Sequence, residues 1–454
     1  MNGVAAGECP VPIGRWQQAA VFVHRHRAVL AVIGLGLICR LGMLLFYLST
    51  HGWQGEAWEP EVIAQRLMEG KGLTMPSYGG RASVSFSPIF PVISYLLHLI
   101  WGPGLGLFYA FHLAVASLVL WLTYLLGSQV FDHRTGLLAA LLVAVEPGLV
   151  IYQSYKVDHN ALTMLLMLLA ARLILLVARS GDRCLAFTCG LVIGIAVLTR
   201  PDELSLFGML GVWVWVERRN LMTILRPAAL ILAGAAMILV PWMARNSLLH
   251  GQPVFITTYS GEALWRGNNP NSTGTGLTLD GRPQFSAAPV EFQQKIAEAT
   301  EAGQSALFKE EALRYIRRDP AGFLVRCFKK LYYFWWFTPT YAAIHYEWVP
   351  VSLVAAYKVL YGIMLALAIL GLRVAFRETG NAYAWIVLSI PLWMALIHSL
   401  SYVEGRHRLM VMPIILLLTA SGMLALKDLF TSPGLRLRRH AQALTNRIEQ
   451  AGMD

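Results

Sequence analysis

The chain has 454 residues, of which 56% are hydrophobic and only 14% are charged. This composition excludes an ordinary soluble protein of this size and is typical of a polytopic helical membrane protein. The formal net charge of +11 does not indicate a nucleic-acid partner, because lysines and arginines at loop ends set the orientation of membrane helices. We therefore expect membrane lipids around the chain and no nucleic acid.

Long apolar stretches follow one another along the chain, and each has about the 20 residues that a membrane-spanning helix needs. They are residues 28–50, 104–131, 134–154, 160–178, 184–199, 203–217, 224–243, 351–373, 382–401 and 409–427. The sequence therefore predicts an all-α polytopic membrane protein with about ten transmembrane helices, in a range of nine to thirteen. Residues 88–101 form a shorter apolar piece, which fits an interfacial or re-entrant helix better than a span.

Basic residues near the ends of these stretches predict the topology. Those before the first span, at Arg15, Arg25 and Arg27, place the N-terminus in the cytoplasm, and two loops then lie on the outer side. The expected parts are a cytoplasmic segment 1–27, an N-terminal transmembrane module 28–245 with an outer loop 51–86, a large outer loop 246–350, C-terminal transmembrane helices 351–427 and a basic cytoplasmic tail 428–454. Both outer loops are expected to contain interfacial and soluble helices.

Several arginines are exceptions to this topology because they fall on the outer side. They are Arg200, Arg245, Arg266, Arg406 and Arg408. Ionisable groups at the edge of a membrane usually face an interior or a watery cavity, and arginine binds phosphate through two hydrogen bonds. A convergent set of outer arginines therefore predicts an anionic ligand at the membrane surface. The alternative is that they pair with Asp202, Glu203 and Glu404, or reach outward to lipid headgroups.

Carboxylates gather just after the first span, at Glu56, Glu59 and Glu61. A carboxylate beside a membrane cavity can act as a general base. Glu56 and Glu59 are three residues apart and would share one face of a helix. The alternative reading is the solvated face of a loop.

A polar cluster at the outer end of the third span includes Asp158 and Asn160. Such a pair can help to bind a metal or a sugar, or it can simply end one helix and begin the next, with Asp158 as an N-cap. The five cysteines show no metal-ligand spacing. We expect no cofactor and no protein-bound metal, with a divalent ion as the less favoured alternative.

The second outer loop contains "SGEALWRGNNPNSTGTG", which is rich in glycine and asparagine. Trp265 offers an aromatic face, and Asn268 and Asn269 offer amides, which together suit a sugar ring. The alternative is a series of tight turns stabilised by the same residue types.

Four segments together resemble the GT-C integral-membrane glycosyltransferases, in the branch of the protein mannosyltransferases and the lipid A aminoarabinose transferase. They are an acidic residue followed by "IAQRLMEGKGL" and then "SPIFPVISYLL", "LTRPDEL", "PWMARNSLLHGQPVFITTYSGEALWRGNNP" and "EGRHRLMVMP". They spread over about residues 50 to 420, and their order and spacing carry the resemblance.

The resemblance implies an inverting transfer of a sugar from a polyprenyl-phosphate donor to a hydroxyl of a glycan, lipid or protein, with residues 28–245 as the catalytic module. The enzyme would lie in the cytoplasmic membrane with its active site facing the periplasm or exterior. The base would be Glu56, which matches the usual position, or Glu59, which keeps the spacing to "IA". The residues expected to bind substrate are Asp158, Asn160, Arg200, Arg245, Asn246, Trp265, Asn268, Asn269, Arg406, His407 and Arg408.

Two other classes of function remain as alternatives. A transporter or flippase of an anionic glycolipid would use the same outer arginines, but it should show inverted repeats and broken helices at matching positions, which the sequence lacks. A scaffold subunit whose outer loop binds another protein would leave the set of carboxylates and arginines unexplained.

Overall fold

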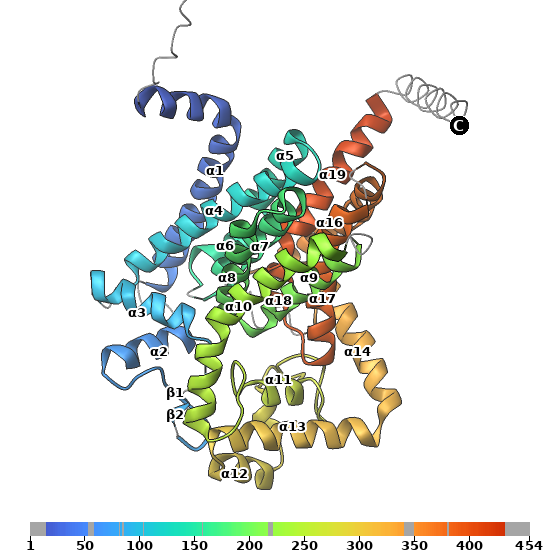
Figure 1. Cartoon of the computed structure of the whole chain (residues 1–454). Helices are drawn as coiled ribbons and strands as arrows, with labels where there is room; N and C mark the ends of the chain where they lie inside the picture. Colours follow the sequence, from blue (N-terminus) through green and yellow to red (C-terminus); the bar gives the residue numbers. More distant parts are fainter. Residues whose placement is uncertain are drawn as a thin grey trace, which may run out of the picture.

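The computed structural model describes residues 15–52, 59–80, 82–83, 86–102, 104–156, 158–216, 221–339, 349–378 and 381–431 (Figure 1). Its longer helices are α1 (Arg15–His51), α4 (Gly106–Val130), α5 (His133–Val145), α7 (Asn160–Ser180), α8 (Arg183–Thr199), α9 (Ser205–Val216), α10 (Leu221–His250), α13 (Glu301–Arg318), α14 (Pro320–Trp335), α16 (Val351–Glu378), α17 (Asn381–Leu400) and α19 (Met412–Thr431). Shorter elements are α2 (Glu59–Met68), β1 (Met75–Pro76), η1 (Tyr78–Gly80), β2 (Ala82–Ser83), α3 (Ile89–Trp101), α6 (Pro147–Ser154), η2 (Pro201–Leu204), α11 (Ser260–Arg266), η4 (Gln284–Ala287), α12 (Val290–Glu298) and α18 (Gly405–Leu409).

Within the described residues, six helices are long and apolar enough to cross a membrane, in α1, α4, α7, α10, α16 and α19. The bent pair α5–α6 would make a seventh, and α3, α8 and the Trp385–Leu400 part of α17 are shorter apolar helices. The expected all-α polytopic membrane protein is therefore confirmed. The short helix α3 matches the apolar piece expected at residues 88–101.

The expected span at residues 134–154 is a bent pair of helices and not one straight helix. The chain breaks at Glu146, and α5 and α6 meet at an angle of 60°. The cause is Pro147, which has no N–H to donate and disfavours the helical conformation in the residue before it. Glu146 is accordingly extended (φ −64°, ψ 121°), and its side chain accepts a hydrogen bond from Leu149 N at 2.6 Å.

The buried Arg40 of α1 compensates for this break. Its guanidinium donates to the carbonyl oxygens of Val143 at 3.2 Å and Ala144 at 3.0 Å, and to the side chain of Gln153 at 2.7 Å. Val143 would normally bond the N–H of residue 147, which proline lacks. Arg40 thus pairs carbonyl groups that the bend leaves open, and it ties α1 to both halves of the broken span.

Glycines allow the closest helix contacts in the bundle. A Cβ on Gly371 of α16 would overlap the carbonyl oxygen of Leu418 in α19, and one on Gly422 of α19 would overlap that of Leu367 in α16. Small residues are the usual means by which membrane helices approach, because burial of apolar surface gives little drive within lipid. The reciprocal glycines therefore fix α16 against α19, the helix that follows the late arginines.

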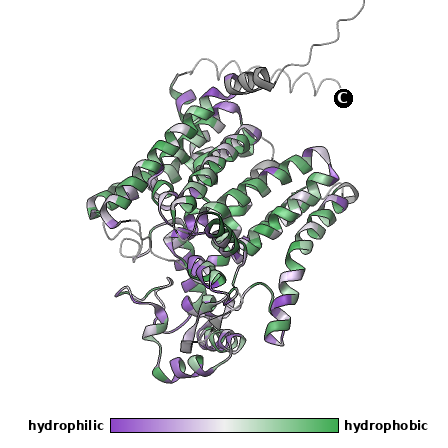
Figure 2. Ribbon diagram, turned by 90° about the vertical axis from the view of Figure 1, so that its left-hand side faces the viewer, coloured by the Kyte–Doolittle hydropathy of each residue, from purple (hydrophilic) through white to green (hydrophobic). Residues whose placement is uncertain are grey.

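The first loop and the segments between α10 and α16 form a layer at one end of the bundle, which we call the extramembrane layer (Figure 1). It comprises α2, β1, η1, β2 and the segments from α11 to α14. Its core holds Trp265, Ile296 and Phe308. Tyr78 joins the first loop to this core, with its ring centroid 4.2 Å from that of Phe285. Long hydrophobic stretches run along the bundle helices, and hydrophilic residues are more frequent in the layer (Figure 2).

Candidate active site

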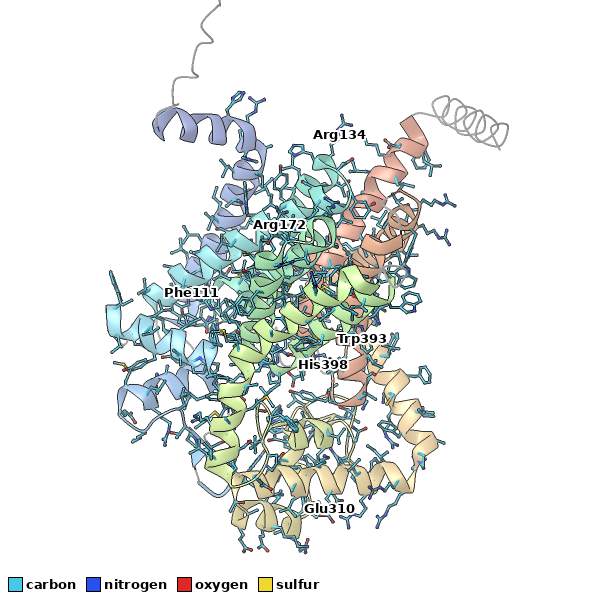
Figure 3. The ribbon with its side chains drawn as sticks, in the orientation of Figure 1. Phe111, Arg134, Arg172, Glu310, Trp393 and His398 are labelled. Carbon is cyan, nitrogen blue, oxygen red and sulfur yellow. The ribbon has the colours of Figure 1, made fainter. Side chains whose placement is uncertain are left out.

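Polar side chains from distant parts of the chain meet where the bundle joins the extramembrane layer. The segments involved are the link between α6 and α7, the corner from α8 into η2, and the turn from α17 into α18. Figure 3 shows His398 at this end of the bundle, between Arg134 at the far end and Glu310 in the layer. The meeting point is a candidate active site.

Arg200 organises the first part of the site. Its Nε donates to both carboxylate oxygens of Asp202, at 2.7 and 2.8 Å, and its Nη1 donates to Asn160 Oδ1 at 2.7 Å. Asn160 in turn donates to Asp158 Oδ2 at 2.5 Å. Pro201 ends α8 and turns the chain into η2, so that Arg200 and Asp202 can face each other. Three residues expected at the site therefore lie together, with Asp202 as an added partner.

Asp158 is almost fully buried within this group. Burial raises the pKa of its carboxyl to about 6, although the Asn160 amide and the charges of Arg406 and Arg200 oppose that rise. Asp202 differs, because the effects of Arg200 and His398 outweigh its burial and hold its pKa below the ordinary value. The site therefore keeps one carboxyl ionised and leaves another poised near neutral pH.

Two histidines connect Asp202 to the late arginine segment. His398 Nε2 lies 3.0 Å from Asp202 Oδ2, and its Nδ1 lies 3.2 Å from the carbonyl oxygen of Tyr402. Its ring stacks on that of His407, with centroids 3.8 Å apart. His407 Nδ1 accepts a hydrogen bond from the backbone N–H of Glu404. His407 therefore fixes the shape of the turn that presents Arg406.

Arg406 lies at the centre of the charged groups. Its Nε is 2.7 Å from Glu404 Oε2. Burial alone would lower the pKa of the guanidinium, but Glu404, Tyr402, Tyr152 and Glu59 act together to raise it. Glu59, in the first turn of α2, is the smallest of these named influences on the pKa of Arg406.

The three glutamates of the first loop have different environments. Glu56 lies outside the described residues. Glu61 is buried, and it accepts hydrogen bonds from Ser94 Oγ at 2.7 Å and lies 2.6 Å from His98 Nε2. This pairing clamps α2 to α3. Glu59 is exposed at the start of α2, which makes it the accessible carboxylate of the two that the structure describes.

Arg408 points away from Arg406. Its guanidinium lies over the rings of Phe337 and Tyr361, at 4.5 and 4.2 Å, and its Nη1 donates to the carbonyl oxygen of Trp336 at 2.6 Å. Residues two apart on a helix face nearly opposite sides. The side chain is also almost fully buried, so its contacts tie α18 to α16 and to the end of α14.

Arg245 and Asn246 lie near the C-terminal end of α10. Arg245 stacks on Trp242, with its guanidinium 4.4 Å from the ring centre, and donates to Asn246 Oδ1 at 2.8 Å. Asn246 donates to the carbonyl oxygen of Ile256 at 2.9 Å. Their contacts hold the corner between α10 and the loop that follows.

The asparagine-rich loop is bonded largely to itself and its neighbours. Trp265 is buried against Phe292 and Phe308 in the core of the extramembrane layer. Asn268 Nδ2 donates to Leu264 O and Leu400 O, both at 2.8 Å. Asn269 Nδ2 donates to Trp265 O at 2.9 Å, and Asn269 Oδ1 accepts from Asn271 N. Through these contacts Trp265, Asn268 and Asn269 stabilise the extramembrane layer.

The sequence did not single out His398, and it offered Asp202 and Glu404 only as alternative partners of the outer arginines, which is how Arg200 and Arg406 use them. It placed Arg266 among the outer arginines without naming its partner Glu262. Arg266 Nη2 lies 2.6 Å from Glu262 Oε1, and the guanidinium lies over Tyr259 and Tyr402. The spacing of Glu262 and Arg266 on one helix was a readable signal. In the stretches that the structure describes, no group of three or more His, Cys, Asp or Glu residues could hold a metal ion.

An apolar cavity of about 740 Å³ lies in the bundle beside the site. It is lined by Cys39 and Met43 of α1, by Val145, Pro147, Gly148, Val150 and Ile151 around the α5–α6 bend, and by Val349, Leu353, Val354, Ala356, Tyr357 and Leu360 at α16. Tyr357 donates to Glu146 at 2.5 Å beside it. Helix α6 borders both regions, because Gly148 lines the cavity and a Cβ placed on it would come within 2.9 Å of the side chain of Leu409 in α18.

Comparisons with known proteins bear on the fold and on one segment of the sequence. A family model described as dolichyl-phosphate-mannose-protein mannosyltransferase matches residues 86–244. No curated protein matches the chain. The oligosaccharyltransferase AglB of Archaeoglobus fulgidus, solved with an inhibitory peptide and a dolichol-phosphate, aligns at 14% identity and a TM-score of 0.54, covering 93% of this chain and 52% of that one.

Two further solved structures are similar. The same archaeal enzyme, tethered to an acceptor peptide containing the NVT sequon, aligns at 15% identity and a TM-score of 0.53, covering 90% of this chain and 50% of that one. ArnT of Cupriavidus metallidurans, bound to undecaprenyl phosphate, aligns at 14% identity and a TM-score of 0.41, covering 88% and 78%. The chain spans about half the length of the archaeal structures.

The fold and the family match together confirm the resemblance seen in the sequence. The chain has the polytopic helical fold of the GT-C membrane glycosyltransferases. The family model described as dolichyl-phosphate-mannose-protein mannosyltransferase matches only the segment 86–244, which is about a third of the chain.

Proposed function

We propose that the chain is an inverting glycosyltransferase of a cytoplasmic membrane, which moves a sugar from a polyprenyl-phosphate-linked donor to an acceptor hydroxyl at the outer, periplasmic or exterior face. The observation that carries the proposal is that Arg406, held by Glu404, lies on a turn whose His407 ring stacks on His398 beside the Arg200–Asp202 pair, at the end of the bundle nearest the extramembrane layer. Departure of a phosphate needs a cation, and attack by a hydroxyl needs a base. The guanidinium of Arg406 is the proposed cation, and Glu59, exposed at the start of α2, is the proposed base.

The proposed reaction is a single displacement. The acceptor oxygen attacks the anomeric carbon from the side opposite the phosphate, and the bond from that carbon to the phosphate oxygen breaks. The electron pair leaves with the lipid phosphate, which gains one negative charge. The proton of the acceptor hydroxyl moves to the base, for which Glu59 is our choice over Glu56, and the sugar is transferred with inversion.

Arg406 is the proposed binder of the lipid phosphate. A guanidinium fixed before the reaction stabilises charge that develops on the leaving group. Arg200 donates to Asn160, and Asn160 donates to Asp158, whose carboxyl feels the charge of Arg406. We propose that Arg200 and Asn160 supply further polar contacts to the donor. Arg408, Arg245, Asn246, His407, Trp265, Asn268 and Asn269 are proposed to support the site through the contacts described above.

The apolar cavity supports a lipid-linked donor. Its volume lies in the range of about 300–1,000 Å³ that is common for ligand sites, and the lining is almost wholly apolar. We propose that part of the isoprenoid chain lies there, alongside α6, while the phosphate reaches Arg406. The dolichol-phosphate seen with the archaeal oligosaccharyltransferase is a ligand of the same chemical class.

The acceptor and the metal requirement are left to experiment. The archaeal relative has been solved with peptides and, in one structure, with zinc and sulfate. A glycan, a lipid or a protein is the proposed acceptor class here. The steps proposed above use side chains of this chain alone, so we expect activity in the presence of EDTA.

A donor panel tests the proposal. Purified protein in detergent would be mixed with labelled polyprenyl-phosphate and polyprenyl-diphosphate sugars and candidate acceptors, and release of the lipid phosphate would be followed with and without EDTA. We expect release from one donor. Tight donor binding with no release under any condition would contradict the proposal and would favour a transporter or flippase of an anionic glycolipid.

A further inference from the structure

Lys330 of α14 is a fully buried lysine in the extramembrane layer. Its ammonium lies 2.9 Å from Ser401 O, 3.1 Å from Asn268 Oδ1, 3.3 Å from Leu400 O and 3.4 Å from Gly267 O. All four of these acceptors are neutral carbonyl oxygens. In the part of the chain that the structure describes, the ammonium is therefore surrounded by carbonyl oxygens, which we call the cage, and it bonds to no carboxylate.

The cage joins three segments that are distant in the sequence. Gly267 and Asn268 follow α11, while Leu400 and Ser401 end α17. Asn268 also donates to Leu400 O at 2.8 Å. A Cβ on Gly267 would overlap the carbonyl oxygen of Ser401, so the two backbones are in direct contact. Lys330 thus holds α11 and α17 together from the side of α14.

The turn that follows Ser401 carries Glu404 and Arg406. Val403 N donates to Gly274 O at 3.0 Å, and a Cβ on Gly276 would overlap Glu404 Oε1. Glu404 then holds Arg406 through the contact at 2.7 Å. A continuous set of contacts therefore leads from the Lys330 ammonium to the guanidinium of Arg406.

Burying the ammonium of Lys330 costs free energy of desolvation, which an apolar side chain at the same position would not. Burial lowers the pKa of Lys330 to about 8, so the protonated form is disfavoured in the folded protein. Methionine would fill a similar volume without desolvating a charge. The contacts of the ammonium, rather than the volume of the side chain, are therefore what distinguish lysine here.

We propose that Lys330 is a positioning residue, whose buried ammonium holds the segment Ser401–Arg408 against the end of α11 and so fixes the orientation of Arg406. The effect on a phosphate ligand rests on the proposed function. The effect on the segment itself does not, so the two are tested separately.

Hydrogen exchange tests the effect on the segment. Full-length Lys330→Met and wild type would be compared in detergent, with Lys329→Met as the matched control, because Lys329 is exposed on the same helix. We expect at least tenfold faster amide exchange over residues 401–408 in Lys330→Met, with unchanged protection in α4 and α7. Unchanged exchange over 401–408 would overturn the proposal.

Chemical rescue separates charge from volume. Lys330→Ala lacks the part of the side chain that propylammonium would restore, and propanol has nearly the same size without the charge. We expect Lys330→Ala to bind farnesyl phosphate at least tenfold more weakly than wild type, and propylammonium to recover most of that loss. Equal recovery with propanol would overturn the role of the ammonium.

The two arms also distinguish this inference from the proposed function. If wild type fails to bind farnesyl phosphate or a longer polyprenyl phosphate, the proposed function fails. Hydrogen exchange over residues 401–408, with and without propylammonium in Lys330→Ala, then decides the inference alone. Slower exchange with propylammonium but not with propanol would support it.

Discussion

His398 and Asp202 are 196 positions apart in the sequence, yet His398 Nε2 lies 3.0 Å from Asp202 Oδ2. The same carboxylate binds Arg200, and the His398 ring stacks on His407. These contacts therefore join the corner after α8 to the turn before α19.

Replacing His398 should weaken these contacts. His398→Leu removes one partner of a buried carboxylate, which costs about 2–4 kcal/mol of the free energy of unfolding. We expect a melting temperature several degrees lower in detergent and weaker binding of a polyprenyl phosphate. His24→Leu serves as the control, because His24 is exposed on α1. A His398→Leu variant with wild-type melting and binding would show that the contact is dispensable.

The two late arginines should respond differently to truncation. Arg406→Ala should weaken polyprenyl-phosphate binding by about 10- to 100-fold, since a charge-assisted hydrogen bond contributes about 1.5–3 kcal/mol. Its melting temperature should stay near that of wild type. Arg408→Ala should weaken binding and also lower the melting temperature, because it empties the space between Phe337 and Tyr361.

Titration of binding and thermal melting of the same samples checks this pair of expectations. Arg282→Ala is the matched control, since Arg282 is exposed and paired with Asp280 on the extramembrane layer. Wild-type affinity in Arg406→Ala would remove it from the phosphate site. A stable Arg408→Ala variant with weak binding would instead place Arg408 at the ligand.

Asp158 gives the site a pH dependence of a defined sign. Its pKa is raised from 3.8 in the unfolded chain to about 6 in the folded protein. The stability that this group contributes is therefore complete below about pH 3.8 and is lost as the pH rises through about 6. The loss is on the order of 3 kcal/mol.

Melting of wild type and Asp158→Asn from pH 4 to pH 7.5 measures this contribution. We expect the wild type to lose stability relative to the variant as the pH rises through about 6, since asparagine does not ionise. Binding of a polyprenyl phosphate should also tighten below pH 6, where Asp158 no longer repels the phosphate. A difference between the two melting curves that is constant with pH would contradict the assignment.

Filling the apolar cavity should discriminate donors by chain length. Ala356 lines the cavity, and the neighbouring Ala355 is also exposed on α16 but does not line it. Ala356→Trp should weaken binding of an undecaprenyl phosphate at least tenfold and affect farnesyl phosphate less. Ala355→Trp should leave both affinities unchanged. Equal effects on both ligands, or none, would show that the isoprenoid chain lies elsewhere.

Sequence patterns marked several residues that the structure brings together at the candidate site, and offered two of their contacts, Arg200 with Asp202 and Arg406 with Glu404, as an alternative. The departure of Arg200 and Arg406 from the expected charge distribution marked them, because a charge at the membrane edge must be satisfied. The charge pattern marked Arg408 in the same way, but Arg408 packs among aromatic rings. Arg406 and Arg408 are two residues apart on a helix, so their side chains face nearly opposite sides, and a charge pattern does not show this.

Residues that act through distant partners left the weakest signals. His398 and Lys330 carry no spacing pattern that sets them apart, and their partners lie 196 and up to 71 positions away. Trp265 and Asn269 suggested a sugar site, yet asparagine amides and aromatic rings serve turns and cores equally well. The break at Glu146 was readable, since a proline follows it inside an apolar stretch.

The proposed glycosyl transfer depends on Glu59, because the acceptor hydroxyl needs a base. Glu59→Gln keeps the size of the side chain and removes its ability to take a proton. We expect turnover to fall by about 100-fold or more, with little change in donor binding. Glu69→Gln is the control, since Glu69 is exposed just beyond the same helix and paired with Lys71.

The most direct measurement is the rate at which labelled lipid phosphate is released in a single turnover, with donor and acceptor in excess of their binding constants. Wild type, Glu56→Gln, Glu59→Gln and Glu69→Gln would be compared side by side. We expect wild-type release in Glu69→Gln and near-complete loss in Glu59→Gln with the donor still bound. Normal release in both Glu56→Gln and Glu59→Gln would contradict a base in the first loop.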